Sequence, residues 1–158
     1  MFVTQERMPR LLLALSPTIP WIMPYMTVSW PPYATDERAL AIRHMEPGLT
    51  GSLLLLDRWY PSKAFIAQTL NMGFSFVMRV REKWNLEADQ IKTQGEVTIS
   101  QKGRVFTVRV LKTRLSSGET ETLLTNLNQM QLPIRNAGEL YFKRWGIETA
   151  YDTLKSKL

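Results

Sequence analysis

Cysteine is absent from this sequence, and histidine occurs only once, as His44. The lack of cysteine excludes disulfide bonds, thiolate zinc sites and a cysteine nucleophile. The single histidine excludes a histidine-rich metal site, and we expect His44 to be an exposed or capping residue of a helix. A bound metal ion must therefore be held by carboxylates, which favours hard ions such as Mg2+ or Mn2+.

Long apolar runs are also scarce, and the most marked one, Leu11 to Trp30, is interrupted by prolines. Each proline removes a backbone donor, so Pro17, Pro20 and Pro24 argue against a membrane-spanning helix. The run superficially resembles a signal peptide, yet no small-residue cleavage site clearly follows it. A secreted or membrane protein is therefore the weakest interpretation, and we expect no membrane partner.

The sequence does have a moderate excess of positive charge, spread over 158 residues. This length suffices for one domain with a buried core. The 20 lysines and arginines outnumber the 14 aspartates and glutamates, which gives a net charge of +6 and an isoelectric point near 9.8. The balance favours a polyanionic partner, but only weakly, because many basic proteins bind none.

The middle of the chain has the pattern of a strand, a helix and a second strand. Ser52–Leu56 is a continuous apolar run, typical of a strand buried on both faces. Pro61–Met72 predicts a helix, and the alternation over Phe74–Arg81 predicts a half-buried strand. Together they indicate a βαβ unit of an α/β fold. Asp57 follows the first strand, at the end where open α/β sheets place their sites.

Further elements are predicted on both sides of this unit from caps, turn residues and alternation. Three strands form a small antiparallel β-sheet, inserted over about residues 94–127 before the last helix. The expected ranges are a helix over 37–46, a polar connection over 83–90, strands over 96–100, 104–113 and 121–127, and a last helix that starts at a capping box of Asn136 and Glu139.

The last stretch, Gly138 to Leu158, gathers charged and phenolic side chains on one helical face. A helix turns about 100° per residue, so Tyr141, Arg144, Glu148 and Lys155 share a narrow sector beside an apolar one. An Arg–Glu pair at i, i+4 also occurs on ordinary helix surfaces, where it contributes about 0.3 kcal/mol. Periodicity alone therefore leaves both a solvated surface and a functional site open.

The spacing Tyr-x2-Arg-x3-Glu-x6-Lys of these residues resembles the Y-R-E-K signature of a family of bacterial insertion-sequence transposases. These are DDE transposases with a ribonuclease-H-like fold. The run LLLLDRWYPSKAFI followed by GFSFVMRVR resembles the same family, and the likeness covers roughly Tyr33 to Leu158. It implies that Asp57 is the second aspartate of the DDE triad and that Glu148 is its glutamate. Trp59 stands where the family commonly has glycine.

The resemblance also implies a chemistry, which is metal-assisted attack on a DNA phosphodiester with two Mg2+ or Mn2+ ions. In this interpretation Asp57 bridges the ions and Glu148 binds one of them. Simpler roles stay open for several residues: a turn-forming cap for Asp57, core packing for Trp145 and a solvated charge for Arg58. The residues expected to contact the DNA of the transposon ends are Tyr141, Arg144, Lys155, Arg58 and Trp145.

The first aspartate of the triad is not found, so the expected ribonuclease-H-like core is incomplete. No carboxylate before Asp57 follows a predicted strand; the four are Glu6, Asp36, Glu37 and Glu46. We expect residues 34–158 to be a partial catalytic domain and residues 1–33 to be a non-matching or disordered segment, produced by truncation or a frame change. The chain also ends three residues after Lys155, where the family continues. It is therefore expected to be a truncated, inactive copy.

Two alternatives to a transposase stay open. The first is a DNA-binding remnant without catalysis, which the missing aspartate favours. The second is an unrelated ribonuclease-H-like nuclease, which the alignment of Tyr141, Arg144 and Lys155 with Glu148 disfavours, because a nuclease needs only the carboxylates. The family resemblance further implies a homodimer on DNA and a cytoplasmic, nucleoid-associated protein.

Overall fold

The computed structural model describes residues 13–15, 38–39, 42 and 51–155 and, among them, the side chains of 38–39, 42 and 51–144. The expectations for His44, for most of the helix over 37–46 and for most of residues 1–33 lie outside this part of the chain. No helix within the described residues is long and apolar enough to cross a membrane.

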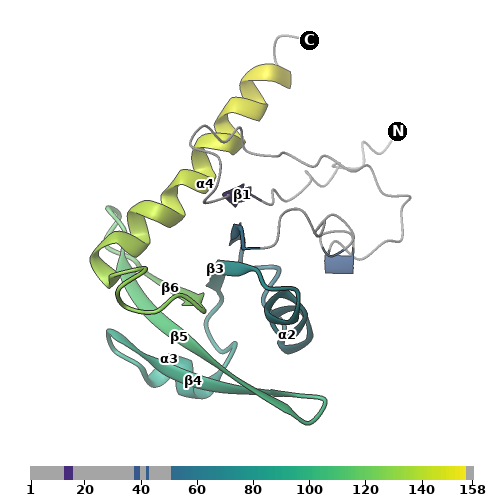
Figure 1. The fold of residues 1–158 in the computed structure, drawn as a ribbon. Helices are drawn as coiled ribbons and strands as arrows, with labels where there is room; N and C mark the ends of the chain where they lie inside the picture. The colour runs from purple at the N-terminus through teal and green to yellow at the C-terminus, as the bar shows by residue number, and fades with distance from the viewer. Residues whose placement is uncertain (1–12, 16–37, 40–41, 43–50, 156–158) are drawn as a thin grey trace, which may run out of the picture.

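The described residues form one six-stranded sheet with helices packed on it. The strands are β1 (Leu13–Leu15), β2 (Leu53–Leu56), β3 (Ser75–Val80), β4 (Gln94–Gln101), β5 (Arg104–Arg114) and β6 (Thr120–Thr125). The helices are α2 (Lys63–Asn71), α3 (Leu86–Gln90) and α4 (Ile134–Lys155). The strand order is β1-β2-β3-β6-β5-β4 (Figure 1). Only β2 and β3 are parallel; all other neighbours in this sheet are antiparallel.

The predicted βαβ unit is confirmed by β2, α2 and β3. Helix α2 begins after Ser62, whose Oγ accepts a hydrogen bond from the amide of Phe65 at 3.1 Å. Pro61 therefore precedes the cap instead of lying in the first turn. Gly73 closes the helix with a φ of +77°, a conformation that glycine adopts without steric cost.

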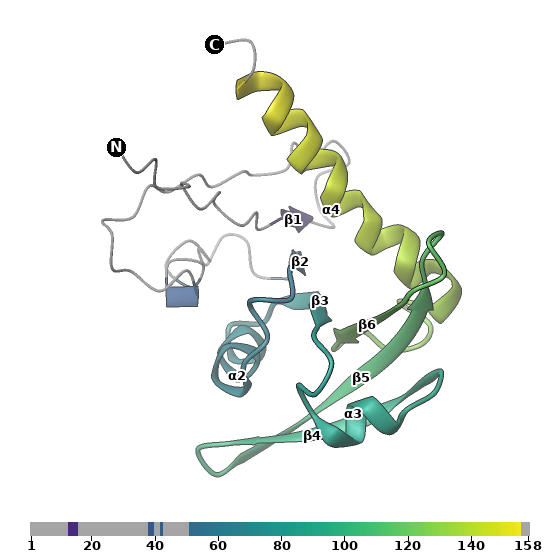
Figure 2. The ribbon, with the colours of Figure 1, turned by 180° about the vertical axis from the view of Figure 1, so that it is seen from behind.

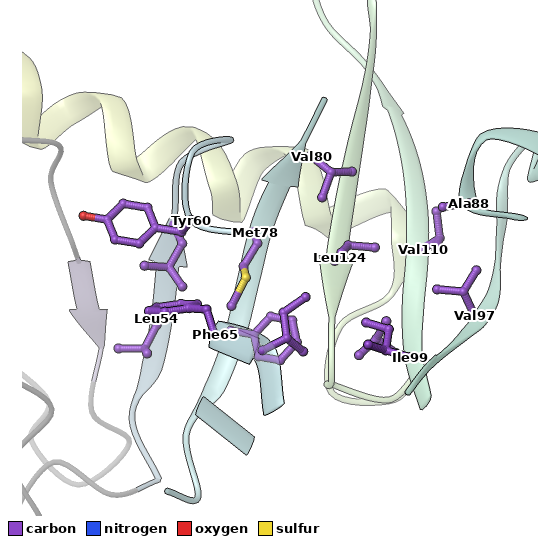
Figure 3. Packing of buried hydrophobic residues seen from close by; sticks show 14 of the residues in the cluster. Leu54, Tyr60, Phe65, Met78, Val80, Ala88, Val97, Ile99, Val110 and Leu124 are labelled. Carbon is purple, nitrogen blue, oxygen red and sulfur yellow. The ribbon is translucent and has the colours of Figure 1, made fainter. Parts of the chain in front are cut away.

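Two apolar cores cover the two faces of the sheet, because side chains alternate along each strand. Helix α2 covers one face, where Phe65 lies beside Leu54 and Met78, and the same apolar core continues to the β4–β5 hairpin (Figure 3). Helix α4 covers the other face, as Figures 1 and 2 show from opposite sides. Strand β3 was predicted to be half buried, but four of its six residues are buried, since both of its faces carry a helix.

The three antiparallel strands predicted before the last helix are present, and they extend the central sheet. Strand β6 pairs with β3, so β4, β5 and β6 continue the βαβ sheet. Asn126 ends β6 two residues earlier than predicted, because its side chain turns to β3. Its Oδ1 accepts from the amide of Phe76 at 2.9 Å, and its Nδ2 donates to the carbonyl of Phe74 at 3.1 Å.

Two local predictions are wrong. The connection predicted over 83–90 contains helix α3, which Asn85 caps by accepting a hydrogen bond from the amide of Ala88 at 3.0 Å. The capping box at Asn136 does not start the last helix. Helix α4 begins at Ile134, and the amide of Asn136 already donates to the carbonyl of Pro133 within its first turn.

Candidate functional site at the carboxyl edge of the sheet

The sheet face under α4 changes from apolar to polar near the end of β2. Residues two positions apart on a strand point to the same face, so the change from an apolar to a polar side chain can be followed along each strand of this face. The apolar part contains Leu55, Val77, Leu111 and Leu123, and one step nearer the edge the same strands place Asp57, Arg79, Thr113 and Glu121. We call the residues Asp57, Arg79, Glu121, Tyr141 and Arg144 the polar layer.

Asp57 lies at the outer side of the polar layer, directly after β2. Its side chain is 19% exposed, and its Oδ1 lies 3.9 Å from Nη2 of Arg144 on α4. That distance is too long for a hydrogen bond, so the contact is one of charge. The Arg144 side chain is only 3% exposed, and the poor hydration of a covered guanidinium strengthens its field at Asp57. The structure thus brings Asp57 and Arg144 close together, while their roles in metal and DNA binding stay predictions.

Tyr141 connects α4 to the end of β2. Its hydroxyl donates a hydrogen bond to the backbone carbonyl of Leu56 at 3.2 Å, and the residue is 1% exposed. The Arg144 guanidinium carbon lies 5.5 Å from the centroid of the Tyr141 ring. Burial raises the pKa of Tyr141 well above its usual value, so the hydroxyl keeps its proton and stays a donor. The DNA contact predicted for Tyr141 stays a prediction, and it requires the side chain to leave this position.

A second ion pair in the polar layer was missed by the sequence analysis. Nε of Arg79 on β3 lies 3.2 Å from Oε1 of Glu121 on β6, and the Glu121 side chain is 3% exposed. Burial raises the pKa of Glu121, while the nearby charges of Arg79 and Arg144 act in the opposite direction. The sequence does carry a signal for this pair, because Arg79 and Glu121 are charged residues within strands that otherwise bury apolar side chains. Two carboxylates and two guanidinium groups therefore lie together beneath α4.

The loop after Asp57 is held by two arginines. The guanidinium of Arg38 donates two hydrogen bonds to the carbonyl of Trp59, at 2.7 and 3.2 Å. The guanidinium of Arg81 lies 3.1 Å from the centroid of the Trp59 ring, a cation–π contact. Trp59 is not among the described residues with positive φ, so the loop does not need glycine there. Arg58, the predicted phosphate contact, is exposed in this loop.

A pocket of about 670 Å3 opens beside the polar layer, between the first turns of α4 and the ends of β5 and β6. Glu121 and Tyr141 form part of its wall, so the pocket adjoins the Asp57 site. Cations outnumber carboxylates in its lining. The charged lining residues are Arg79, Lys112, Arg114 and Arg135 against Glu121 and Glu139.

The remaining predicted site residues belong to the second half of α4. Trp145, Glu148 and Lys155 lie in this helix, but their side chains are outside the described residues. Glu148 follows Arg144 by about one helical turn along α4. Among the side chains that the structure describes, no group of three or more His, Cys, Asp or Glu residues is placed to hold a metal ion.

Comparison with known proteins agrees with this arrangement. The sequence model of a family described as "Transposase DDE domain" matches residues 33–158, which is most of the chain. No curated protein and no solved structure matches the chain. The matched range contains β2, α4 and the whole polar layer, and the mixed α/β sheet is consistent with a ribonuclease-H-like DDE domain. The chain belongs to the transposase DDE domain family.

Proposed function

We propose that this chain binds the DNA of a transposon end at the carboxyl edge of its sheet, and that alone it does not catalyse strand transfer. The family implies transposase function, which is cleavage and transfer of DNA strands. The observation that carries the proposal is the contact between Asp57 and Arg144, which joins the two parts of the sequence that resemble DDE transposases.

The charges at this edge support DNA as the partner. Arg58 is exposed next to Asp57, and Arg114 and Arg135 line the neighbouring pocket. None of the three is in an ion pair with another described residue. Such cations neutralise backbone phosphates, and counterion release then drives binding in a salt-dependent way. We propose that Arg144 contributes its charge to the same phosphates, together with Lys155, Trp145 and Tyr141 as predicted from the sequence.

The polar layer offers limited means of holding the divalent ions on which the family generally depends. Asp57 supplies hard oxygen donors, which suit Mg2+ or Mn2+, and it is partly open to solvent. Asp57 and Glu148 would hold such an ion, and a bound ion would polarise the phosphodiester and lower the pKa of the attacking hydroxyl. Glu121 cannot readily serve as a third ligand, because it is covered and paired with Arg79.

The lack of an identified first aspartate leads us to propose that this chain is an inactive copy. Strand β1, the neighbour of β2, has the sequence Leu-Ala-Leu and contributes no carboxylate. A site with one ligand fewer binds metal less well and orients the phosphodiester less precisely. The chain would then occupy transposon ends without joining them to a target, which makes a non-catalytic DNA-binding protein the form of the function that we favour.

The test is fluorescence anisotropy of a labelled duplex that carries the ends of the element, with the purified chain and its R144Q variant. We expect the chain to bind, and R144Q to weaken binding by about tenfold, or ~1.4 kcal/mol, because the phosphates lose the charge of a poorly hydrated guanidinium. R104Q is the matched control, because Arg104 lies at the far end of β5 and hydrogen-bonds Asn71. Equal affinities of R144Q and the parent chain would contradict the proposal.

The same protein and duplex test the proposed inactivity. A duplex with a free 3′-hydroxyl at the transposon end is incubated with the chain, Mn2+ and a supercoiled target plasmid. We expect no joined product on a gel. Joining that depends on Mn2+ and disappears in D57N would show that the triad is complete, and it would overturn this part of the proposal while leaving DNA binding intact.

A further inference from the structure

Trp59 is a large aromatic residue to which the proposed function gives no task. It lies two residues after Asp57, in the loop that leaves the carboxyl edge of the sheet, and it is 38% exposed. The next residue, Tyr60, is buried and packs against Phe65 with 5.6 Å between the ring centroids. The loop therefore turns one aromatic ring into the core and leaves the other at the surface beside Asp57.

The backbone of this loop is fixed by hydrogen bonds at Trp59 and around it. The amide of Tyr60 donates to the carbonyl of Asp57 at 3.0 Å, which closes a turn. Nη2 and Nε of Arg38 both donate to the carbonyl of Trp59, at 2.7 and 3.2 Å. A fixed backbone leaves Trp59 only its side-chain torsions, so the ring stays near Asp57.

Arg81 stacks on the Trp59 ring from the end of the neighbouring strand. Strands β2 and β3 are parallel, and Leu56 lies opposite Met78, so Trp59 and Arg81 follow their strands at equivalent positions. The guanidinium carbon of Arg81 lies 3.1 Å from the centroid of the Trp59 ring, a close cation–π contact. Stacking uses the face of the guanidinium, and its N–H donors lie in the plane, where they can reach other partners.

The N–H donors of Arg81 are not used within the part of the chain that the structure describes. Arg81 is exposed, and it forms no hydrogen bond and no ion pair with another described residue. Arg79, two residues earlier, is by contrast paired with Glu121 at 3.2 Å. A planar guanidinium that is held in one orientation and keeps its donors is suited to bind a phosphate with two parallel hydrogen bonds.

We propose that Arg81 binds a phosphate of the DNA backbone beside Asp57, and that Trp59 is a positioning residue whose ring holds the Arg81 guanidinium in place for it. A guanidinium that is already oriented loses less conformational freedom on binding. The inference rests on the proposed function, because it requires DNA at the carboxyl edge. It also gives a task to the tryptophan that stands where the family commonly has glycine, since glycine could not provide the stack.

The test is fluorescence anisotropy of the labelled transposon-end duplex with the whole chain and its R81Q, W59L and W59F variants. At about 0.15 M salt we expect R81Q to weaken binding by about fivefold, because one phosphate contact is lost. W59L keeps every charge but removes the aromatic face, and we expect a loss of about threefold. W59F keeps an aromatic face and should bind nearly as well as the parent chain. R104Q, at the far end of β5, is the matched control and should bind like the parent.

Two further readouts separate positioning from other effects of the substitutions. R81Q should reduce the slope of log K against log salt by about 0.9, and W59L should reduce the slope too, although its net charge is that of the parent. The W59L/R81Q double variant should bind no more weakly than R81Q, because Trp59 acts through Arg81. If urea unfolding shows that W59L is not folded, R81K takes its place, since lysine keeps the charge but has no planar group to stack.

Parent-like binding by R81Q would overturn the phosphate contact. Parent-like binding by W59L, or by R81K in its place, would overturn the positioning role, and so would additive losses in the double variant. A chain that binds no duplex would refute the proposed function and this inference together. A chain that binds the duplex and is weakened by R144Q but not by R81Q would refute this inference alone.

Discussion

Tyr141, a residue predicted to contact DNA, also has a role in the fold. Its hydroxyl reaches the carbonyl of Leu56, at the point where β2 ends and Asp57 begins. Burial keeps the hydroxyl protonated, so the hydrogen bond persists at any pH near neutral. Tyr141 therefore holds the backbone next to Asp57, whatever it does on DNA.

The Y141F substitution should lower the free energy of unfolding by about 1–2 kcal/mol, because the buried carbonyl of Leu56 loses its side-chain donor. Urea denaturation of the two proteins measures the difference. The control is F142A, the next residue along α4. Phe142 is 69% exposed, so its truncation should change the free energy by less than about 0.5 kcal/mol. Equal losses in the two variants would show that the hydrogen bond does not matter.

Glu121 should make stability depend on pH in a direction set by its burial. Its pKa lies above the ordinary value of 4.5, mainly because of burial and despite the charges of Arg79 and Arg144. The folded state therefore binds this proton more tightly than the unfolded state. The contribution of Glu121 to the free energy of unfolding then falls as pH rises from about 4.5 through the pKa of the folded state.

Urea titrations of the parent chain and E121Q from about pH 4 to pH 8 test this sign, since the variant lacks the titrating group. We expect the parent to lose stability relative to E121Q as pH rises. The charged groups that face Glu121 are Arg79 on β3, Arg144 on α4 and Asp57 after β2. If the parent chain instead gains stability relative to E121Q as pH rises, the charges of Arg79 and Arg144 lower the pKa of Glu121 more than burial raises it.

Among the elements, strand β6 connects the predicted βαβ unit and the predicted antiparallel strands into one sheet. It joins β3 of the βαβ unit to the β4–β5 hairpin, and Asn126 fixes its end through two hydrogen bonds to the backbone of Phe74 and Phe76 at the start of β3. We expect N126A to lower the free energy of unfolding by about 1–3 kcal/mol, because a partly buried amide and carbonyl lose their partners. N71A, which removes one exposed hydrogen bond to Arg104, should cost less than about 0.5 kcal/mol. Thermal or urea unfolding compares the two.

The elements with a clear period could be predicted from the sequence, and those set by side-chain capping could not. The run at β2 and the alternation along β5 depend on burial, which the sequence pattern records. The start of α4 and the presence of α3 depend on which polar group accepts a hydrogen bond from which backbone amide. Several nearby polar groups could do so, and the sequence does not say which one does. The pairing of β6 with β3 joins segments far apart in the sequence, and the hydrophobic pattern of a strand does not show which other strand pairs with it.

The site shows the same division. The sequence placed Asp57 at a strand end and Arg144 on the last helix, and the structure brings these two together. The pairing of Glu121 with Arg79 could not be predicted, because an ion pair between two strands depends on which strands are neighbours and on their register. Trp59 does not have a positive φ, so a residue other than glycine is compatible with the loop at that position. The predicted role of Glu148 stays a prediction.

At the scale of the whole molecule, the charges and the polar layer support the proposal that DNA binds at one edge of the sheet. Asp57, Glu121 and the pocket lie at this edge, while the turn at Lys102 and Gly103 between β4 and β5 projects from the opposite one (Figure 2). A basic net charge alone would allow DNA to bind anywhere on the surface. We propose that DNA binds at the carboxyl edge and not at the opposite turn.

Site-specific photocrosslinking to a labelled duplex tests this claim most directly. A benzophenone amino acid replaces Arg58 at the carboxyl edge in one protein and Lys102 at the opposite turn in another. Both positions are exposed and each substitution removes one positive charge, so the proteins are matched in charge. We predict that position 58 crosslinks to the duplex at least ~10-fold more efficiently than position 102 at moderate salt, where non-specific contacts are screened. Equal yields, or a higher yield at position 102, would contradict the placement of DNA at the carboxyl edge.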